Sequence, residues 1–271
     1  MAVTAFQSEI LRLIARSRKK DGEATYIAGG LALNHQLRRP RVSSDIDVFN
    51  STYEALEASS AKDCAVLAKA GLDLKVLRQR DFIVEVRVSR GNDVTDLQWV
   101  VDSAYRFFPL IEDELLGLTL HPFDLATNKL LALAGRRVPR DWVDTITCSE
   151  ALQPLGLLAW AATGKDPGLS PAYILEMCMR THYSQDEFDI AIANREDYDL
   201  AQLAQKWHDM IWRARETVAK LPPEHVGKAV MTAAGELFNG TDDEQLVAAL
   251  KAGSLTFHEG HIGGSWPRII R

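Results

Sequence analysis

One segment near the start of the chain combines a short apolar strand, a glycine pair, a helix and a second strand with two aspartates. The first strand spans Tyr26 to Ala28, the glycines are Gly29 and Gly30, and the second strand carries Asp45 and Asp47. Residues along a strand alternate between its two faces, so the two aspartates share one face and their apolar neighbours take the other. This predicts a strand buried on one side, with two carboxylates side by side on the other.

Two adjacent carboxylates are costly unless a cation lies between them, and hard oxygen ligands suit Mg²⁺ or Mn²⁺. Gly29 and Gly30 allow a phosphate chain to approach the backbone closely, at the start of a helix whose N–H groups favour anions. Arg41 and Ser43 come just before the aspartates, within reach of phosphate. We therefore predict a site for a divalent metal and the phosphates of a nucleoside triphosphate.

A metal site of this kind needs a third carboxylate on a neighbouring strand, and Asp96 is the favoured candidate. It lies within the predicted strand Val94 to Val101, where an aspartate is disfavoured unless something compensates for it. Glu85 on the preceding strand is the rival, but Arg87 shares its face and offers a plain surface ion pair. We expect Asp96 to complete the site formed by the two aspartates and to lower the pKa of an attacking hydroxyl.

A second group of charged residues follows in a helical region. Lys129 and Arg136 are two helical turns apart and fall on nearly one stripe, and Lys129 could meet the β- and γ-phosphates as a point charge. Asp141 and Asp144 lie three residues apart at the start of the next helix. Two interpretations of these acids stay open: an ion pair with Arg136 or Arg140, or direct contact with substrate.

These residues resemble a known family. The motifs that carry the resemblance are Gly-Gly-x-Ala-Leu from Gly29, Arg-x-Ser-x-Asp-Ile-Asp-Val-Phe from Arg41, Leu125 to Leu133 around Lys129, and Arg136 followed by Arg140-Asp141-Trp142-Val143-Asp144. Together they are similar to nucleotidyltransferases of the AbiEii/AbiGii toxin type, within the DNA polymerase β-like superfamily. The likeness covers about the first 150 residues in separate blocks, a span typical of one domain. Leu31 departs from the pattern, because many members have Ser or Thr directly after the glycine pair.

The resemblance implies an Mg²⁺-dependent enzyme that transfers NMP from an NTP to an acceptor hydroxyl. It also implies a toxin of a bacterial toxin–antitoxin or phage-defence pair, with an RNA such as tRNA as acceptor and a cognate antitoxin as partner. Two alternatives remain at this stage. One is a nucleotide-binding regulator without transfer activity, suggested by Leu31, and the other is an antibiotic-type nucleotidyltransferase that modifies a small molecule.

The order of predicted elements indicates an α+β chain in two parts. Residues 1–121 are expected to form the nucleotidyltransferase core, a mixed sheet with flanking helices in the polymerase β-like arrangement. Residues 122–271 are expected to form an all-helical C-terminal domain that carries the Lys/Arg-Asp-x-x-Asp motif, including helices at Leu200 to Lys220 and Pro223 to Phe238. The stretch from His258 to Arg271 is glycine-rich and predicted to be irregular.

Composition narrows the protein class. The net charge of −6 is mildly acidic, so a nucleic-acid partner would need a local basic patch. Cys64, Cys148 and Cys178 are widely spaced without a Cys-x-x-Cys motif, which favours buried thiols in a reducing cytoplasm over a zinc site or disulfides. No apolar run approaches the length of a membrane span, so we expect a cytoplasmic protein without a membrane partner.

Overall fold

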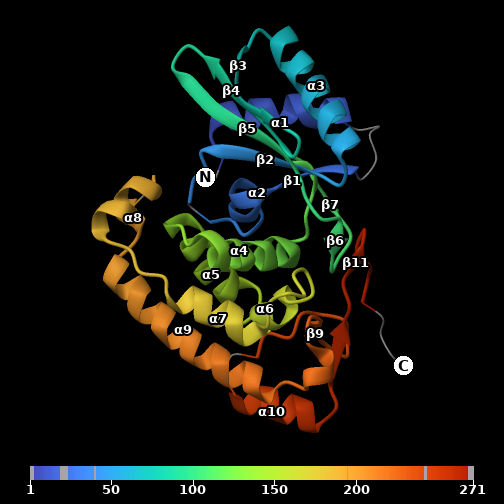
Figure 1. Cartoon of the computed structure of the whole chain (residues 1–271), viewed down its shortest axis with the longest axis vertical. Coiled ribbons are helices and arrows are strands. Elements are labelled where there is room, and N and C mark those ends of the chain that lie inside the picture. Colours follow the sequence, from blue (N-terminus) through green and yellow to red (C-terminus); the bar gives the residue numbers. More distant parts are fainter. Residues whose placement is uncertain (1–2, 19–23, 40, 194, 241–242, 268–271) are drawn as a thin grey trace. The chain divides into compact units, whose positions relative to one another are not determined.

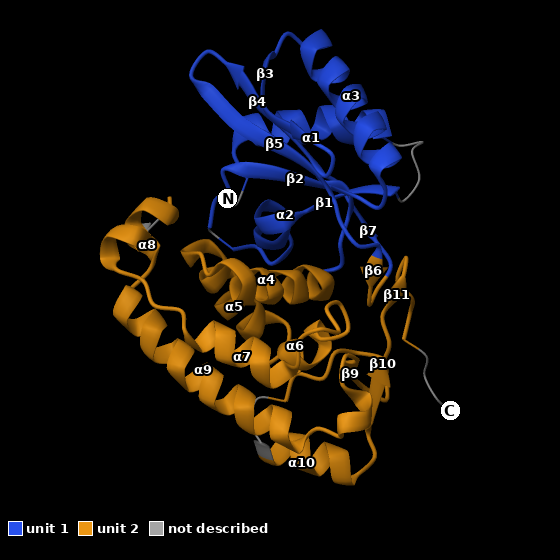
Figure 2. Cartoon of the chain, in the orientation of Figure 1, with its two compact units in different colours: residues 1–104, 109–121 blue, residues 105–108, 122–271 orange. Residues whose placement is uncertain are grey.

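The structure is a computed structural model that describes residues 3–18, 24–39, 41–193, 195–240 and 243–267. It divides into two compact units, shown in Figure 2. Unit 1 comprises residues 1–104 and 109–121, and unit 2 comprises residues 105–108 and 122–271. Each unit has its own core, and the two are described separately below.

Unit 1 is built on a seven-stranded mixed sheet with the strand order β3-β4-β5-β2-β1-β8-β7 (Figure 1). The strands are β1 (Thr25–Ala28), β2 (Asp45–Asn50), β3 (Asp73–Arg80), β4 (Ile83–Arg90), β5 (Asp93–Val101), β7 (Ile111–Asp113) and β8 (Gly117–Thr119). The helices are α1 (Ala5–Arg18), α2 (Gly29–Gln36) and α3 (Tyr53–Lys69). β2 pairs with β5 in parallel and with β1 antiparallel, so β2 is a central strand of the sheet.

Strand alternation gives this sheet one covered face. Along β4, Val84, Val86 and Val88 are buried while the residues between them are more exposed. Helices α1 and α3 contact each other and β5, and α3 also contacts β4. Figure 1 shows both helices beside this part of the sheet. The other face of β2 to β5 carries the polar residues, as expected for a half-buried sheet.

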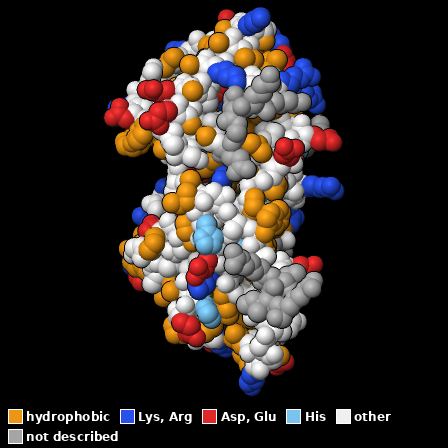
Figure 3. Space-filling view, turned by 90° about the vertical axis from the view of Figure 1, so that its right-hand side faces the viewer, with side chains coloured by type: hydrophobic (Ala, Val, Ile, Leu, Met, Phe, Trp, Pro, Cys, Tyr) orange, Lys and Arg blue, Asp and Glu red, His pale blue; other side chains and the backbone are white. Residues whose placement is uncertain are grey.

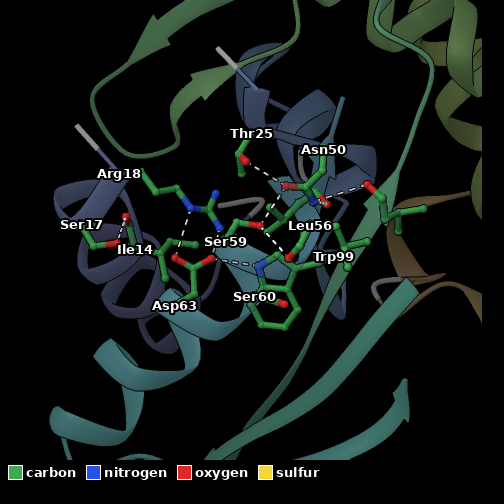
Figure 4. A network of polar contacts seen from close by, with 12 residues as sticks. Ile14, Ser17, Arg18, Thr25, Asn50, Leu56, Ser59, Ser60, Asp63 and Trp99 are labelled. Atoms are coloured by element: carbon green, nitrogen blue, oxygen red, sulfur yellow. Dashed lines mark hydrogen bonds and ion pairs between the residues drawn. The ribbon is translucent and has the colours of Figure 1, made fainter. Parts of the chain in front are cut away.

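A buried polar network joins the covered face to its helices (Figure 4). The Asp63 carboxylate on α3 pairs with Arg18 of α1 and accepts a hydrogen bond of 2.9 Å from the indole N–H of Trp99. At the end of β2, the side-chain oxygen of Asn50 accepts a 2.8 Å hydrogen bond from Thr25 of β1. Asp63, Trp99 and Asn50 are fully buried, so these contacts satisfy groups that would be costly to leave unpaired.

Unit 2 is mostly helical. Its helices are α4 (Pro122–Arg136), α5 (Pro139–Ala151), α6 (Leu155–Ala162), α7 (Pro171–Met179), α8 (Gln185–Ala191), α9 (Leu200–Lys220) and α10 (Asp243–Lys251). Two short antiparallel pairs complete it: β9 (Ala229–Thr232) with β10 (Leu255–His258), and β6 (Tyr105–Arg106) with β11 (His261–Ile262). Trp160 and Leu157 of α6 pack with Val230 of β9 in one of its core clusters. The α6–α9 approach depends on Gly156, where a Cβ would lie 2.7 Å from Thr217 Cβ.

The C-terminal part differs from the prediction in two segments. Pro223 to Phe238 is not a helix: it contains a 3-10 turn at Pro223–His225 and then β9. The run from His258 is not wholly irregular, because β11 pairs with β6; residues 268–271 lie outside the described part of the chain. In the lower half of Figure 3, histidine side chains lie beside acidic and basic ones. An ion pair joins Lys228, next to β9, and Glu259, next to β10. The expectation of an all-helical C-terminal part is therefore wrong for these strands.

The chain as a whole is confirmed as α+β, with a mixed sheet and flanking helices. Within the described ranges, no helix has both the length and the apolar character that crossing a lipid bilayer would require.

Candidate active site

The two aspartates of β2 lie on its less buried face. Asp45 and Asp47 are half-buried, whereas Ile46 and Val48 between and after them are fully buried. The predicted alternation along this strand is therefore present. Because β2 is held by hydrogen bonds to strands on both sides, the two carboxylates project from a rigid element rather than from a loop.

Asp96 of β5 lies directly opposite Asp45 in the parallel β2–β5 pairing. Directly paired residues project to the same face, so Asp96, the third predicted carboxylate, shares the face of Asp45. It lies one strand away, at a strand spacing of about 4.8 Å. Its carboxylate is already held by Arg87 of β4. The Arg87 Nε donates to Asp96 Oδ1 and Nη2 donates to Oδ2, both at 2.8 Å.

This pairing corrects one sequence-based interpretation. We expected Arg87 to pair with Glu85, but Glu85 accepts a hydrogen bond of 3.3 Å from Gln98 Nε2. The signal was present in the sequence: counting outward from the Gly91 turn places residue 87 opposite residue 96 and residue 85 opposite residue 98. Arg87 is thus a neighbour of the candidate site that we did not predict.

Gly29 opens α2 against the Asp47 side chain. Its φ is 71°, in the left-handed region that favours glycine. A Cβ at this position would overlap Asp47 Oδ2 and would lie 2.8 Å from Asp47 Cβ. A glycine is therefore required here by both the backbone and the Asp47 carboxylate. Gly30 follows within the first turn of α2 and is buried.

The remaining predicted phosphate contacts are less accessible than expected. Arg41 is 2% exposed and Ser43 is 4% exposed. The Ser43 carbonyl accepts a 2.7 Å hydrogen bond from Gln7 Nε2 of α1, and Arg41 Nη1 donates to the Val42 carbonyl at 3.4 Å. Leu31, the departure from the family pattern, is fully buried in α2. These observations place Arg41 and Ser43 in the packing of unit 1 beside the start of β2.

The donor set of this face fits a hard divalent cation in type, because it consists of carboxylate oxygens. In the part of the chain that the structure describes, no three Asp, Glu, His or Cys side chains are gathered closely enough to hold an ion. The bidentate pair between Arg87 and Asp96 is one physical reason, since it directs both Asp96 oxygens toward a guanidinium. Asp45 and Asp47 are therefore the residues that could receive the metal first.

The second predicted group lies in unit 2 and forms a compact ionic cluster. Lys129 Nζ is 3.0 Å from Asp141 Oδ1 and 3.2 Å from Asp144 Oδ2. Arg136 Nε donates to Asp141 Oδ2 at 2.6 Å. Burial would raise the pKa of Asp141, but the hydrogen bond from Arg136 and the charge of Lys129 outweigh it and lower that pKa below its usual value. Of the two interpretations left open for Asp141, the ion pair with Arg136 is thus observed.

The cluster is asymmetric in exposure. Only 11% of the Lys129 side chain and 1% of each aspartate side chain is exposed, whereas 61% of the Arg136 side chain is exposed. The Lys129 charge is therefore shared between two buried carboxylates. Arg136 is the cation of this cluster that solvent and ligands can reach.

A second buried ion pair in unit 2 was not predicted. Asp124 at the start of α4 is fully buried, accepts hydrogen bonds from the backbone N–H groups of Phe107 and Phe108, and lies 2.8 Å from Lys165 Nζ. All the polar atoms of this carboxylate are thus used to fasten residues 105–108 to α4. We interpret the Asp124 carboxylate as structural. An Asp at the start of a helix is common, and the sequence gives no signal that Lys165 is its partner.

No protein-family profile and no curated protein sequence matches the chain. Solved structures do. JHP933 from Helicobacter pylori is 15% identical with a TM-score of 0.50, over 80% of this chain and 95% of that one. MenT4, a nucleotidyltransferase toxin from Mycobacterium tuberculosis H37Rv, is 12% identical with a TM-score of 0.57, over 81% of this chain and 83% of that one. At this identity the likeness shows the fold: the chain has a polymerase β-like nucleotidyltransferase fold.

Proposed function

We propose that the protein is an Mg²⁺-dependent nucleotidyltransferase that transfers NMP from an NTP to an acceptor hydroxyl. The observation that carries the proposal is the arrangement on the open face of the sheet. Asp45 and Asp47 project from β2, Asp96 lies in register with Asp45 on β5, and Gly29 makes room for Asp47 at the start of α2. This arrangement occurs in a chain whose fold is that of nucleotidyltransferases.

The reaction assigns a role to each of these residues. The acceptor oxygen attacks the α-phosphorus, the bond between that phosphorus and the β-phosphate oxygen breaks, and pyrophosphate leaves with the electron pair. Mg²⁺ (or Mn²⁺), when held by Asp45 and Asp47, supplies positive charge that polarises the α-phosphoryl group and lowers the pKa of the attacking hydroxyl. Asp96 completes the site. Its carboxylate takes up the proton of the attacking hydroxyl after Arg87 has released that carboxylate. Gly29 and Gly30 offer backbone N–H groups to the phosphates.

Exposure favours Arg136 over Lys129 as the phosphate-binding cation of unit 2. A cation that binds a phosphate group must be accessible to it, and Arg136 is exposed while it stays paired with Asp141. We therefore assign Lys129, Asp141 and Asp144 to holding this cluster together. Within unit 2, Arg136 rather than Lys129 is therefore the cation that we propose for binding a phosphate group.

For biological context, we infer an AbiEii/AbiGii-type toxin that acts on RNA such as tRNA and is paired with an antitoxin. The support is the resemblance of the motifs from Gly29 to Asp47 and from Lys129 to Asp144. The likeness in fold to a nucleotidyltransferase toxin, MenT4, is consistent with this context.

The experiment is a transfer assay with the purified chain, Mg²⁺, total bacterial RNA and each α-labelled nucleotide in turn. The test variant is Asp45→Asn with Asp47→Asn. The control is Asp73→Asn with Asp93→Asn, which removes two exposed carboxylates from the same sheet. We expect label in RNA with the unmodified chain and the control, and none with the test variant.

Other outcomes would select among the alternatives. Label that enters a small molecule instead of RNA would support the antibiotic-type activity. Nucleotide binding with no transfer to any acceptor would support the regulator. Equal transfer by the test variant and the control would refute the assigned site.

A further inference from the structure

On the open face of the sheet, the acidic side chains lie on the inner strands, and a cation of the edge strand β3 lies at the end of each row of paired residues. Strand pairing places Asp45, Asp96, Arg87 and Lys75 opposite one another in one row across four strands. Directly paired residues project to the same face. Carboxylates therefore lie at the β2 and β5 end of this row, and cations lie at the β4 and β3 end.

The next two rows share with the first row only the cation on β3. In the second row, Asp47 and Gln98 are followed by Glu85 and then by Arg78 on β3. The third row is apolar at β2, β5 and β4 and ends on Arg80 of β3. Each row thus ends on a cation of β3, and the three cations are Lys75, Arg78 and Arg80.

A β-bulge creates this arrangement. The register between β3 and β4 shifts between Val76 and Arg78, which leaves Leu77 as the extra residue. In a regular strand, Leu77 and Gln79 would share the face of Lys75, because side chains alternate with a period of two. The bulge turns Arg78 and Arg80 to that face instead. Rows along a strand are about 6.6 Å apart, so the cations are evenly spaced.

The cations of β3 are exposed and have no ion pair with the described residues of the chain. They differ in this from Arg87, which is bound to Asp96, and from Arg90, which is bound to Glu9. Regularly spaced cations without acidic partners on a surface suit a polyanion with repeating charges.

An exposed aromatic pair lies at the end of the same strand. Phe82, in the turn after β3, is 58% exposed, and Tyr53 at the start of α3 is 42% exposed. Their ring centroids are 4.9 Å apart. Exposed aromatic rings next to a row of cations are the elements that proteins use to bind single-stranded nucleic acids, with phosphates on the cations and a base stacked on a ring.

We infer that β3 is the docking surface for the acceptor, a single-stranded segment of RNA. Its phosphates bind Lys75, Arg78 and Arg80, and a base stacks on Phe82. The face of the sheet then leads from the bound strand to the carboxylates, because Lys75 is three strands, or about 14 Å, from Asp45. The identification of this ligand as the acceptor rests on the proposed function, but the binding itself does not require catalysis.

Edge strands also use bulges and basic residues simply to prevent pairing with other sheets. That explanation accounts for cations on β3, but it does not require them to share the face of the carboxylates or to end beside an aromatic pair. The two explanations differ in what a loss of charge does. Edge protection predicts aggregation, whereas RNA docking predicts weaker binding by a protein that remains monodisperse.

The test measures binding of a fluorophore-labelled 12-nucleotide single-stranded RNA by anisotropy, without NTP, over a range of salt concentrations. The variant is Arg78→Ala with Arg80→Ala. The matched control is Arg12→Ala with Arg16→Ala, two exposed arginines of α1 on the covered side of the sheet. Loss of two phosphate contacts should weaken binding about tenfold at 0.15 M salt and reduce the slope of log K against log salt by about 1.4. Phe82→Ala should weaken binding by about fivefold or more.

Equal effects of the test and control pairs would overturn the inference, as would an unmodified chain that does not bind this RNA. Size-exclusion chromatography checks each variant, and Arg78→Gln with Arg80→Gln replaces the alanine pair if the latter aggregates. The transfer assay keeps the two proposals apart. Label transfer that is unaffected by the Arg78 and Arg80 changes would leave the enzyme standing and remove the docking surface.

Discussion

Replacing Gly29 by alanine places a methyl group where the Asp47 carboxylate lies. The added Cβ would overlap Asp47 Oδ2, so the carboxylate must move away from the start of α2. The φ of 71° adds a backbone cost, because a residue with a Cβ in the left-handed region is less stable by about 1–2 kcal/mol. We therefore expect Gly29→Ala to affect both the stability of unit 1 and the position of a proposed metal ligand.

Gly71→Ala is the matched control for this change. Its φ is 79°, and a Cβ there would meet nothing within 4 Å. The backbone cost and the effect of alanine on the unfolded chain are shared by the two variants and cancel in the comparison. What remains is the overlap with Asp47, for which overpacking of a filled site gives about 1–3 kcal/mol.

The assay is urea-induced unfolding followed by circular dichroism, with the transfer reaction measured on the same preparations. We expect Gly29→Ala to lose about 1–3 kcal/mol more than Gly71→Ala and to lose transfer activity that Gly71→Ala keeps. Equal losses of stability in the two variants would refute the close approach of Gly29 and Asp47. A normal transfer rate in a folded Gly29→Ala protein would refute the need for Asp47 at its present position.

Three further outcomes follow from buried groups of unit 2. Asp141→Asn leaves Lys129 without one of its partners and should cost about 3–5 kcal/mol in chemical unfolding, a loss that the exposed-site change Asp209→Asn should not reproduce. The pKa of Asp141 is lower in the folded than in the unfolded chain, so its contribution is complete above the unfolded-state pKa of about 3.9 and is lost as the pH falls through the folded value. Acid unfolding curves should therefore differ between the unmodified chain and Asp141→Asn at neutral pH and converge in acid; parallel curves would contradict this. Burial raises the pKa of Cys178 to about 12, so iodoacetamide at pH 8 should modify this thiol only after unfolding, as peptide mass spectrometry can show.

Much of unit 1 could be predicted because its signals are local. Alternation from Asp45 to Val48 gives the orientation of β2, and the two-residue turn at Gly91 fixes the register between β4 and β5. The same register implied the pair between Arg87 and Asp96. The prediction was wrong because it paired Arg87 with Glu85 of its own strand, whereas the partner of Arg87 lies across the hairpin.

Other features depend on contacts between distant parts of the chain. The parallel pairing that places Asp96 opposite Asp45 joins strands with a helix and a hairpin between them, and no local pattern sets that register. The bulge at Leu77 is also invisible in the sequence, since an unbroken strand pattern would place Leu77 on the face that Arg78 takes. Pro223 to Phe238 was predicted as a helix, but Val230 is drawn into the core beside Trp160 as part of a strand, because tertiary packing overrides propensity.

The most direct test of the central claim is pyrophosphate release from each NTP in the presence of Mg²⁺ and RNA, measured for single substitutions. We expect release by the unmodified chain and by Asp73→Asn, and a loss of at least a hundredfold in Asp47→Asn, since a lost metal ligand removes transition-state charge stabilisation worth several kcal/mol. Release by Asp47→Asn at the rate of Asp73→Asn would contradict the assignment of the β2 carboxylates as the catalytic metal site.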